Sequence, residues 1–292
     1  MIYICVLNYN NSKDTIECLK SLEHLKDVSY RIILIDNAST DCSYNKLKKY
    51  TNKQSDIVFI RSATNKGYAG GNNLALRYAM LQADMEYCWI LNNDTIVERD
   101  SLSSLIDYMN HNKHVGLCGS KLIYEWDRSK LQGYGGIYNP ILGTVYNCVK
   151  KEKIKDIDYI IGAAVLVRKS FLEDIGLMDE GYFLYYEELD WALRARDKYD
   201  IACVDDSIVY HKEGATIGAN DVKKEKSVLA DYYSIRNRIR LTKKFYPYFL
   251  PTVYMGLIFS MIIRIYRKQF ERVPMIFKLM VGFKDDRHEF NN

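Results

Sequence analysis

The sequence has no Cys-X-X-Cys pair, no strong excess of charge and no uninterrupted apolar run of the roughly 20 residues that a spanning helix needs. Its seven cysteines are scattered and odd in number. They predict buried thiols in a reducing compartment rather than a disulfide framework. The net charge of +4 is too small to argue for a nucleic-acid partner. A strand-like run follows Met1 directly, without a signal-peptide pattern, so we expect a cytoplasmic catalytic part.

What is present is an alternation of apolar runs and helical patterns, with 48% hydrophobic residues in a chain of 292. Ser12 is the predicted N-cap of the first helix. Strand, helix, strand at this rhythm predicts an α/β fold with a parallel, doubly wound sheet. The expected strands are 2–7, 31–35, 57–60 and 87–91, with later ones at 200–204 and 208–210; the expected helices include 12–25, 42–51, 72–83 and 187–198.

Polar clusters follow the first four strands, at 8–11, 36–41, 65–73 and 92–95. Ligands of such sheets bind outside the carboxyl ends of the strands, so these clusters predict one shared site. The glycine-rich run at 65–73 matches neither a phosphate-binding loop nor a dinucleotide fingerprint. It is therefore either a ligand loop or a turn that needs glycine geometry. Asp36 is likewise open to two interpretations: a ligand for a ribose hydroxyl or a base N–H, or a helix N-cap or Asx turn.

Three carboxylates, Glu187, Glu188 and Asp190, stand directly behind an aromatic run at 182–186. Ionised carboxylates are rarely buried without a cation or proton, so this pattern indicates a pocket. Asp94 ends a second strand-like run and His211 ends a third. Their oxygen and nitrogen atoms suit Mg²⁺ or Mn²⁺. The alternatives are a helix cap for Asp94 and a core or surface position for His211.

The last quarter of the chain differs from the rest. Residues 231–240 predict a basic helix rich in aromatics, and residues 249–263 are apolar for about fifteen positions before Arg264, Arg267 and Lys268. An apolar stretch flanked by cations fits a helix lying on an anionic membrane surface. A helix packed on the catalytic domain, or in a homodimer interface, is the alternative.

Six short runs occur in the order seen in family 2 glycosyltransferases, and the sequence most resembles the rhamnosyltransferase-like branch that builds bacterial surface polysaccharides. The resemblance covers about residues 1–240. The runs are 6–10 (VLNYN), 35–41 (IDNASTD), 65–73 (NKGYAGGNN), 91–95 (LNNDT), 162–164 (GAA) and 186–190 (YEELD).

The resemblance implies a GT-A fold, with a Rossmann-like, mostly parallel sheet flanked by helices. It implies a catalytic domain at 1–225, divided into a nucleotide-binding half at about 1–98 and an acceptor half at 99–225, and a helical tail at 226–292. The implied reaction is inverting transfer from a nucleotide-diphosphate sugar, dTDP-rhamnose or a UDP-sugar, to a saccharide acceptor. That acceptor would be lipid-linked, at the inner face of the plasma membrane.

The resemblance also implies roles for single residues. Asp94 and His211 would hold Mn²⁺ or Mg²⁺, because Asp94 matches the last acid of the family's DxD motif, whose first acid is replaced by Asn92. Glu188 falls where the family has its catalytic base, usually Asp, and Asp190 is the rival base. The implied nucleotide-sugar residues are Asn8, Tyr9, Asn10, Asp36, Asn65, Gly67, Gly71, Asn72, Asn93, Gly162 and Ala163.

Two other functions compete with this interpretation. A sugar nucleotidyltransferase would carry a basic, glycine-rich loop after the first strand, where this chain has residues 8–12 (NYNNS). A catalytically degenerate, membrane-associated partner would explain the acid missing at Asn92, but it would not explain three retained carboxylates at 187–190.

Overall fold

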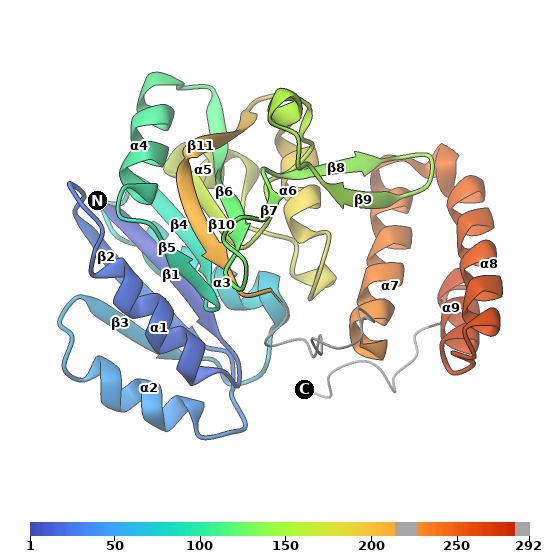
Figure 1. Cartoon of the computed structure of the whole chain (residues 1–292), viewed down its shortest axis with the longest axis horizontal. Helices are drawn as coiled ribbons and strands as arrows, with labels where there is room; N and C mark the ends of the chain where they lie inside the picture. Colours follow the sequence, from blue (N-terminus) through green and yellow to red (C-terminus); the bar gives the residue numbers. More distant parts are fainter. Residues whose placement is uncertain (214–226, 284–292) are drawn as a thin grey trace.

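The computed structural model describes residues 1–213 and 227–283, and within them one sheet of nine strands forms the centre of the molecule (Figure 1). The sheet has the strand order β3-β2-β1-β4-β10-β6-β11-β5, with β7 paired to β6. Its first four strands are parallel, as the alternating pattern predicted. They are β1 (Ile2–Asn8), β2 (Tyr30–Asp36), β3 (Ile57–Arg61) and β4 (Tyr87–Asn92).

The second half of the sheet is mixed. β10 (Ala164–Arg168) runs antiparallel between β4 and β6 (Val115–Tyr124), and β5 (Thr95–Val97) is antiparallel to β11 (Asp200–His211). The prediction of two strands at 200–204 and 208–210 was wrong, because β11 is one strand with an irregularity between Val204 and Ile208. β7 (Leu131–Gly133) is short, and β8 (Gly136–Asn139) and β9 (Thr144–Asn147) form a separate hairpin.

Helices cover both faces of the sheet and close two apolar cores. One core takes side chains from α1 (Ser12–Leu22), α2 (Ser43–Thr51) and α4 (Ser101–His111). The other takes them from α3 (Gly67–Met80), α5 (Lys169–Ile175) and α6 (Glu187–Ala195). Six of the seven cysteines are buried free thiols and Cys42 is exposed.

Two local predictions were wrong. The cap of α1 is Asn11, whose Oδ1 accepts from Asp14 N at 3.4 Å, and Ser12 is the first helical residue. The glycine-rich run at 65–73 is no loop, because α3 begins at Gly67. A Cβ at Gly71 would lie 2.5 Å from the Leu7 side chain, so glycine there lets α3 approach β1 closely.

The tail forms a helical layer at the opposite end of the molecule from β3 (Figure 1). Its helices are α7 (Val228–Phe245), α8 (Leu250–Tyr266) and α9 (Arg272–Met280), which share an apolar core of their own. α7 also packs on the segment before α6 through the hydrogen bonds described below. The predicted domain boundary at 225 lies outside the described residues.

One stretch of the tail, Pro247–Tyr266, is long and apolar enough to cross a membrane by length and composition. It has 20 residues and a mean hydropathy of 1.6, and 11% of it is buried. The expectation that the tail run is too short was therefore wrong, because the helix continues beyond residue 263 to Tyr266.

Candidate active site

The ends of β1 and β2 are joined by a buried polar network. Asn8 Nδ2 donates to Asp36 Oδ1 at 2.9 Å and to Ser39 Oγ at 3.1 Å, and Thr15 Oγ1 donates to Asn8 Oδ1 at 2.8 Å. Asp36 Oδ2 accepts from Ser39 N, three residues on, at 3.2 Å, a local bond of side chain to backbone. Asn8 and Asp36 are both fully buried. In this structure their polar atoms hold the two strand ends together.

Tyr9 and Asn10 follow this network and are partly exposed. Asn10 N donates to Ser39 Oγ at 3.0 Å, and its Oδ1 accepts from Thr40 N at 2.8 Å. The loop after β1 is thereby tied to the loop after β2. These two loops form the rim of the sheet edge where the sequence predicted a nucleoside pocket.

The start of α3 is organised by side-chain amides. Asn65 Oδ1 accepts from Gly67 N and from Asn37 Nδ2, both at 2.9 Å. Asn72 is almost fully buried and its Nδ2 donates to Tyr68 O at 3.1 Å, within the helix. Asn72 and Gly71 therefore serve the packing of α3 on β1, whereas Asn65 and Gly67 stand at the helix start.

Asp94 and His211 lie side by side although 117 positions separate them in sequence. β5, which begins one residue after Asp94, pairs with the end of β11, and Asp94 Oδ1 is 3.2 Å from His211 Nε2. Both residues are buried, with 6% and 7% exposure. Asn92 Nδ2 is 3.5 Å from the same Nε2, whereas Asn93 Nδ2 turns to Thr15 Oγ1 at 2.9 Å.

Gln132 on β7 fixes the His211 ring, since its Oε1 lies 3.0 Å from His211 Nδ1. A partner at Nδ1 orients the imidazole ring, so that Nε2 is directed at Asp94. The sequence analysis did not single out Gln132, because nothing in its neighbourhood marks it as a partner of a histidine 79 positions away.

A carboxylate beside an imidazole nitrogen suits Mn²⁺ or Mg²⁺. Over residues 1–213 and 227–283 no three His, Cys, Asp or Glu side chains gather to hold a metal. Magnesium typically takes one or two protein ligands and completes its shell with substrate phosphate and water. The pair therefore fits a metal held jointly with a diphosphate.

Glu188 lies against the turn that precedes β10. A Cβ at Gly162 would collide with Glu188 Oε1, so glycine there lets the carboxylate approach the backbone closely. Tyr68 Oη donates to Gly162 O at 2.5 Å, and Asn92 N donates to Ala163 O at 3.0 Å. The backbone of Gly162 and Ala163 thus links Glu188 to the strand end that carries Asn92 and leads to Asp94.

Burial raises the pKa of Glu188 to about 7, although hydrogen bonds from the Glu188 and Gly162 backbones act in the opposite direction. Glu188 nevertheless keeps partial exposure to solvent. Its neighbour Glu187 is 1% exposed, and burial and then Glu188 raise the pKa of Glu187 well above its usual value.

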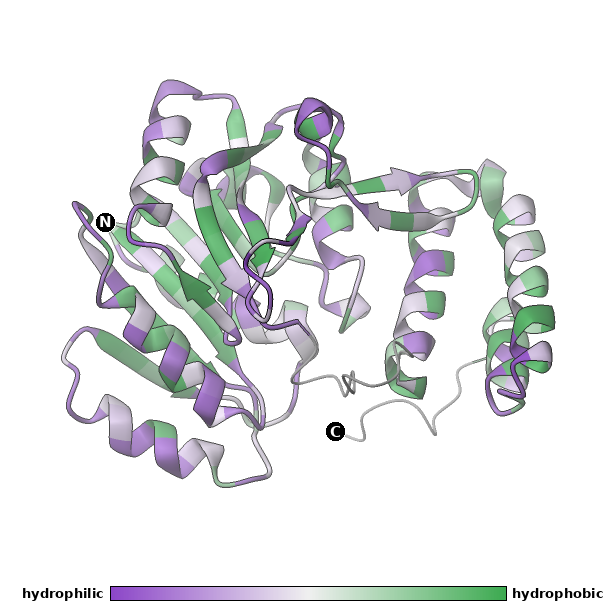
Figure 2. Cartoon of the chain, in the orientation of Figure 1, coloured by the Kyte–Doolittle hydropathy of each residue, from purple (hydrophilic) through white to green (hydrophobic). Residues whose placement is uncertain are grey.

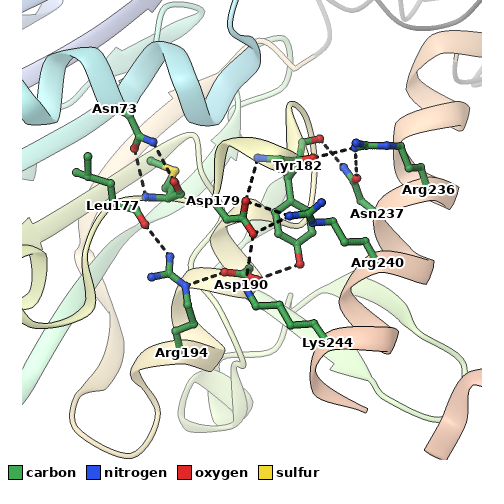
Figure 3. Close-up of polar contacts among 12 residues, drawn as sticks. Asn73, Leu177, Asp179, Tyr182, Asp190, Arg194, Arg236, Asn237, Arg240 and Lys244 are labelled. Atoms are coloured by element: carbon green, nitrogen blue, oxygen red, sulfur yellow. Dashed lines mark hydrogen bonds and ion pairs between the residues drawn. The ribbon is translucent and has the colours of Figure 1, made fainter. Parts of the chain in front are cut away.

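Asp190 occupies a different environment, which Figure 3 shows from the side of α7. It is fully buried, and its Oδ1 accepts from Arg194 Nε at 2.8 Å. Its Oδ2 accepts from Lys244 Nζ at 2.5 Å and from Tyr182 Oη at 3.0 Å. Two cations and a hydroxyl therefore bind this carboxylate between α6 and α7.

Comparison with known proteins matches residues 3–176 to Glycosyl transferase family 2, and the chain belongs to this family. It is a glycosyltransferase with a GT-A fold, as the resemblance of its short motifs implied.

Two relatives illustrate the family. The low-salt glycan biosynthesis hexosyltransferase Agl10 of Haloferax volcanii is 24% identical over 202 residues, which cover 66% of this chain and 61% of Agl10. The rhamnosyltransferase WbbL of Escherichia coli K12 is 27% identical over 207 residues, 66% of this chain and 76% of WbbL. The match thus spans less than two thirds of Agl10.

Among solved structures, the mannosyltransferase PcManGT from Pyrobaculum calidifontis, in complex with GDP-Man and Mn²⁺, superposes with a TM-score of 0.60. The identity is 14%, over 96% of this chain and 84% of that one. At this identity the likeness shows the fold.

Proposed function

We propose that the protein transfers a sugar, with inversion, from a nucleotide-diphosphate sugar to a saccharide acceptor in surface-polysaccharide synthesis. One observation carries this proposal: the backbone of Gly162 and Ala163 connects the Glu188 carboxylate to the strand end beside Asp94 and His211. A base and a metal-binding pair at one edge of the sheet are the parts that such a transfer needs.

In the proposed reaction an acceptor hydroxyl attacks the anomeric carbon on the face opposite the diphosphate. The new C–O bond forms as the bond to the diphosphate oxygen breaks, and Glu188 takes the hydroxyl proton. General base assistance of this kind contributes about 10²–10⁴ in rate. A pKa of about 7 suits a base that works at neutral pH, because much of the group is then ionised and the carboxylate is more basic than an ordinary one.

Asp94 and His211 would hold Mn²⁺ or Mg²⁺, which when bound supplies positive charge to the departing diphosphate. Gln132 would orient the His211 ring for this role through its contact with Nδ1. The rims at Tyr9, Asn10 and Asn65 would receive the nucleoside and diphosphate. Asn8, Asp36, Gly71, Asn72 and Asn93 would act by shaping that pocket, since they are buried and engaged with the protein.

Asp190, the rival base, is proposed to be structural. Arg194 donates to one of its oxygens, and Lys244 and Tyr182 donate to the other. Both oxygens are therefore engaged with the protein and directed away from an acceptor. Since Lys244 comes from α7, we also propose that the catalytic unit extends through α7 and does not end at 225.

The acceptor is proposed to be lipid-linked, and the tail to hold the protein at the cytoplasmic face of the membrane. Residues 232–270 contain no acid and eight Lys or Arg. One face of α8 exposes large apolar side chains, and Figure 2 shows the hydrophobic residues along α8 and α9. The exposed large apolar residues of α8 are Met255, Ile258, Phe259, Ile262, Ile265 and Tyr266.

The tip of the β8–β9 hairpin extends this apolar face. Thr252 on α8 donates to the carbonyl of Ile141, and Ile141, Leu142 and Tyr146 are exposed. An apolar surface bordered by cations and free of acids matches an anionic lipid surface better than a second, equally basic copy of the chain. The alternative is that the same apolar face forms a homodimer interface instead of binding a membrane.

The test is a thermal-shift panel of dTDP-rhamnose, UDP-glucose, UDP-N-acetylglucosamine and GDP-mannose, with and without Mn²⁺. One donor is expected to raise the Tm selectively, because ligand binding stabilises the folded state by a free energy that grows with the logarithm of ligand excess over Kd. Slow, Mn²⁺-dependent hydrolysis of that donor would separate an enzyme from a degenerate partner. No shift with any donor would refute the proposal.

A further inference from the structure

The segment just before Glu187 and Glu188 has an unusual backbone. Phe183, Tyr185 and Tyr186 have φ values of 64°, 70° and 74°, a region that bulky side chains avoid. Leu184 N donates to Tyr182 O at 2.7 Å, which closes a tight γ-turn around Phe183 of the rare positive-φ kind. Such residues cost about 1–3 kcal/mol each and persist only where the surroundings impose them.

One side chain of the tail supplies much of that constraint. Asn237 on α7 is fully buried, and its Nδ2 donates to three carbonyls: Tyr182 O at 2.8 Å, Leu184 O at 2.7 Å and Tyr185 O at 3.0 Å. Its Oδ1 accepts from Arg236 Nη1 at 3.0 Å, so the amide orientation is fixed (Figure 3).

The segment held by Asn237 also rests on the donor side of the site. Phe183 O accepts from Tyr68 N at 2.6 Å, and a Cβ at Gly67 would collide with Phe183. Tyr68 in turn reaches Gly162, the residue that contacts Glu188. The loop 182–186, defined by these contacts, therefore lies between α7 and the start of α3. Its last residue, Tyr186, is the N-cap of α6.

We infer that Asn237 is a positioning residue: its amide holds the loop 182–186 in a conformation that sets the first turn of α6 and with it the Glu188 carboxylate. This inference rests on the proposed function and deepens it, because it makes a residue of the tail necessary for the placement of the base. Without the amide, three carbonyls lose a donor and the positive-φ residues are free to relax.

The test compares Asn237→Ala with Arg240→Gln in the full chain. Arg240 also joins α7 to this region, through Asp179 at 3.0 Å, but does not touch the three carbonyls. Asn237→Ala is expected to lower kcat for the donor that the panel selects by about 10²-fold, the effect of displacing a reacting group by about 1 Å. Binding of UDP with Mn²⁺, and KM, are expected to stay within about threefold.

Amide hydrogen exchange provides a readout that needs no donor. Exchange at residues 183–191 is expected to quicken in Asn237→Ala and to stay at the parental rate in Arg240→Gln. If Asn237→Ala does not fold, Asn237→Ser, which keeps one donor, is measured in the same way and is expected to be intermediate. Parental kcat, or parental exchange at 183–191, in the folded variant would overturn the inference. An inactive parent chain would instead refute the proposed function, and exchange would still decide the positioning role.

Discussion

Lys244 of α7 places its ammonium nitrogen 2.5 Å from Asp190 Oδ2 of α6, and Arg194 occupies the other oxygen of the same buried carboxylate. This ion pair connects the tail to the helix that carries Glu188. Asp190 and Glu188 therefore differ in environment although one residue separates them: the first is surrounded by cations, the second by backbone and aromatic groups.

Asp190→Asn is expected to destabilise the protein and to leave the chemistry intact. Removing one partner of a buried ion pair leaves the other charges unpaired and costs about 3 kcal/mol or more. Urea unfolding is expected to show this loss, while folded Asp190→Asn protein keeps turnover within about threefold. If Asp190→Asn is folded and as stable as the parent but shows no turnover, Asp190 is the catalytic base.

Glu188→Gln is expected to bind donor normally and to turn over about 10²–10⁴ times more slowly, since the amide cannot accept the acceptor's proton. Donor affinity comes from calorimetry and turnover from release of nucleotide diphosphate. Glu17→Gln is the matched control, because Glu17 pairs with Lys212 on the surface. Parental turnover in Glu188→Gln would remove Glu188 from the mechanism.

The pH dependence follows from the raised pKa of Glu188. As a base, Glu188 must be ionised, so kcat/KM is expected to rise with pH through about 7, and Glu188→Gln to lack this limb. The free energy of unfolding changes with pH in the opposite direction to kcat/KM. The folded pKa exceeds the unfolded value of about 4.3, so the native state binds more protons between the two values. The free energy of unfolding should fall from about pH 4.3 to 7 in the parent, and less in Glu188→Gln.

Gln132→Leu is expected to weaken Mn²⁺ binding by about 10–100-fold, because the partner that fixes the ligating histidine is lost. Electron paramagnetic resonance of free Mn²⁺ in the presence of UDP measures this without any catalytic assay. Gln82→Leu, a change in an amide that bonds only Tyr78 O of its own helix, serves as the control. Equal Mn²⁺ affinity in the two variants would contradict a metal at His211.

Flotation with vesicles that contain anionic lipid tests the apolar face of α8. Ile258→Asp with Ile262→Asp is expected to abolish binding, since each acid opposes both apolar burial and attraction to anionic headgroups. Leu81→Asp, at an 83% exposed leucine far from the tail in sequence, is expected to bind like the parent. If the double variant floats like the parent, and the variant is a monomer whereas the parent is a dimer, the apolar face is a self-association surface.

The sequence predicted most of what depends on local pattern. The four parallel strands and the polar clusters at their ends were expected, because periodicity and strand direction determine them. The adjacency of Asp94 and His211 was expected from the family resemblance. The start of α3 was missed because glycine signals a turn equally well when its purpose is close packing against Leu7. Gln132 and Asn237 were missed for another reason. Each acts on a residue about 50 to 80 positions away, and no spacing rule connects them.

A practical consequence follows from the three hydrogen bonds of Asn237 and the ion pair of Lys244. Chimaeras with relatives such as WbbL would exchange donor preference cleanly only when the crossover point falls after residue 245, so that α6 and α7 come from the same parent. A crossover near residue 225 would combine the loop 182–186 of one parent with α7 of the other. Such hybrids are expected to lose activity even when every pocket residue is kept.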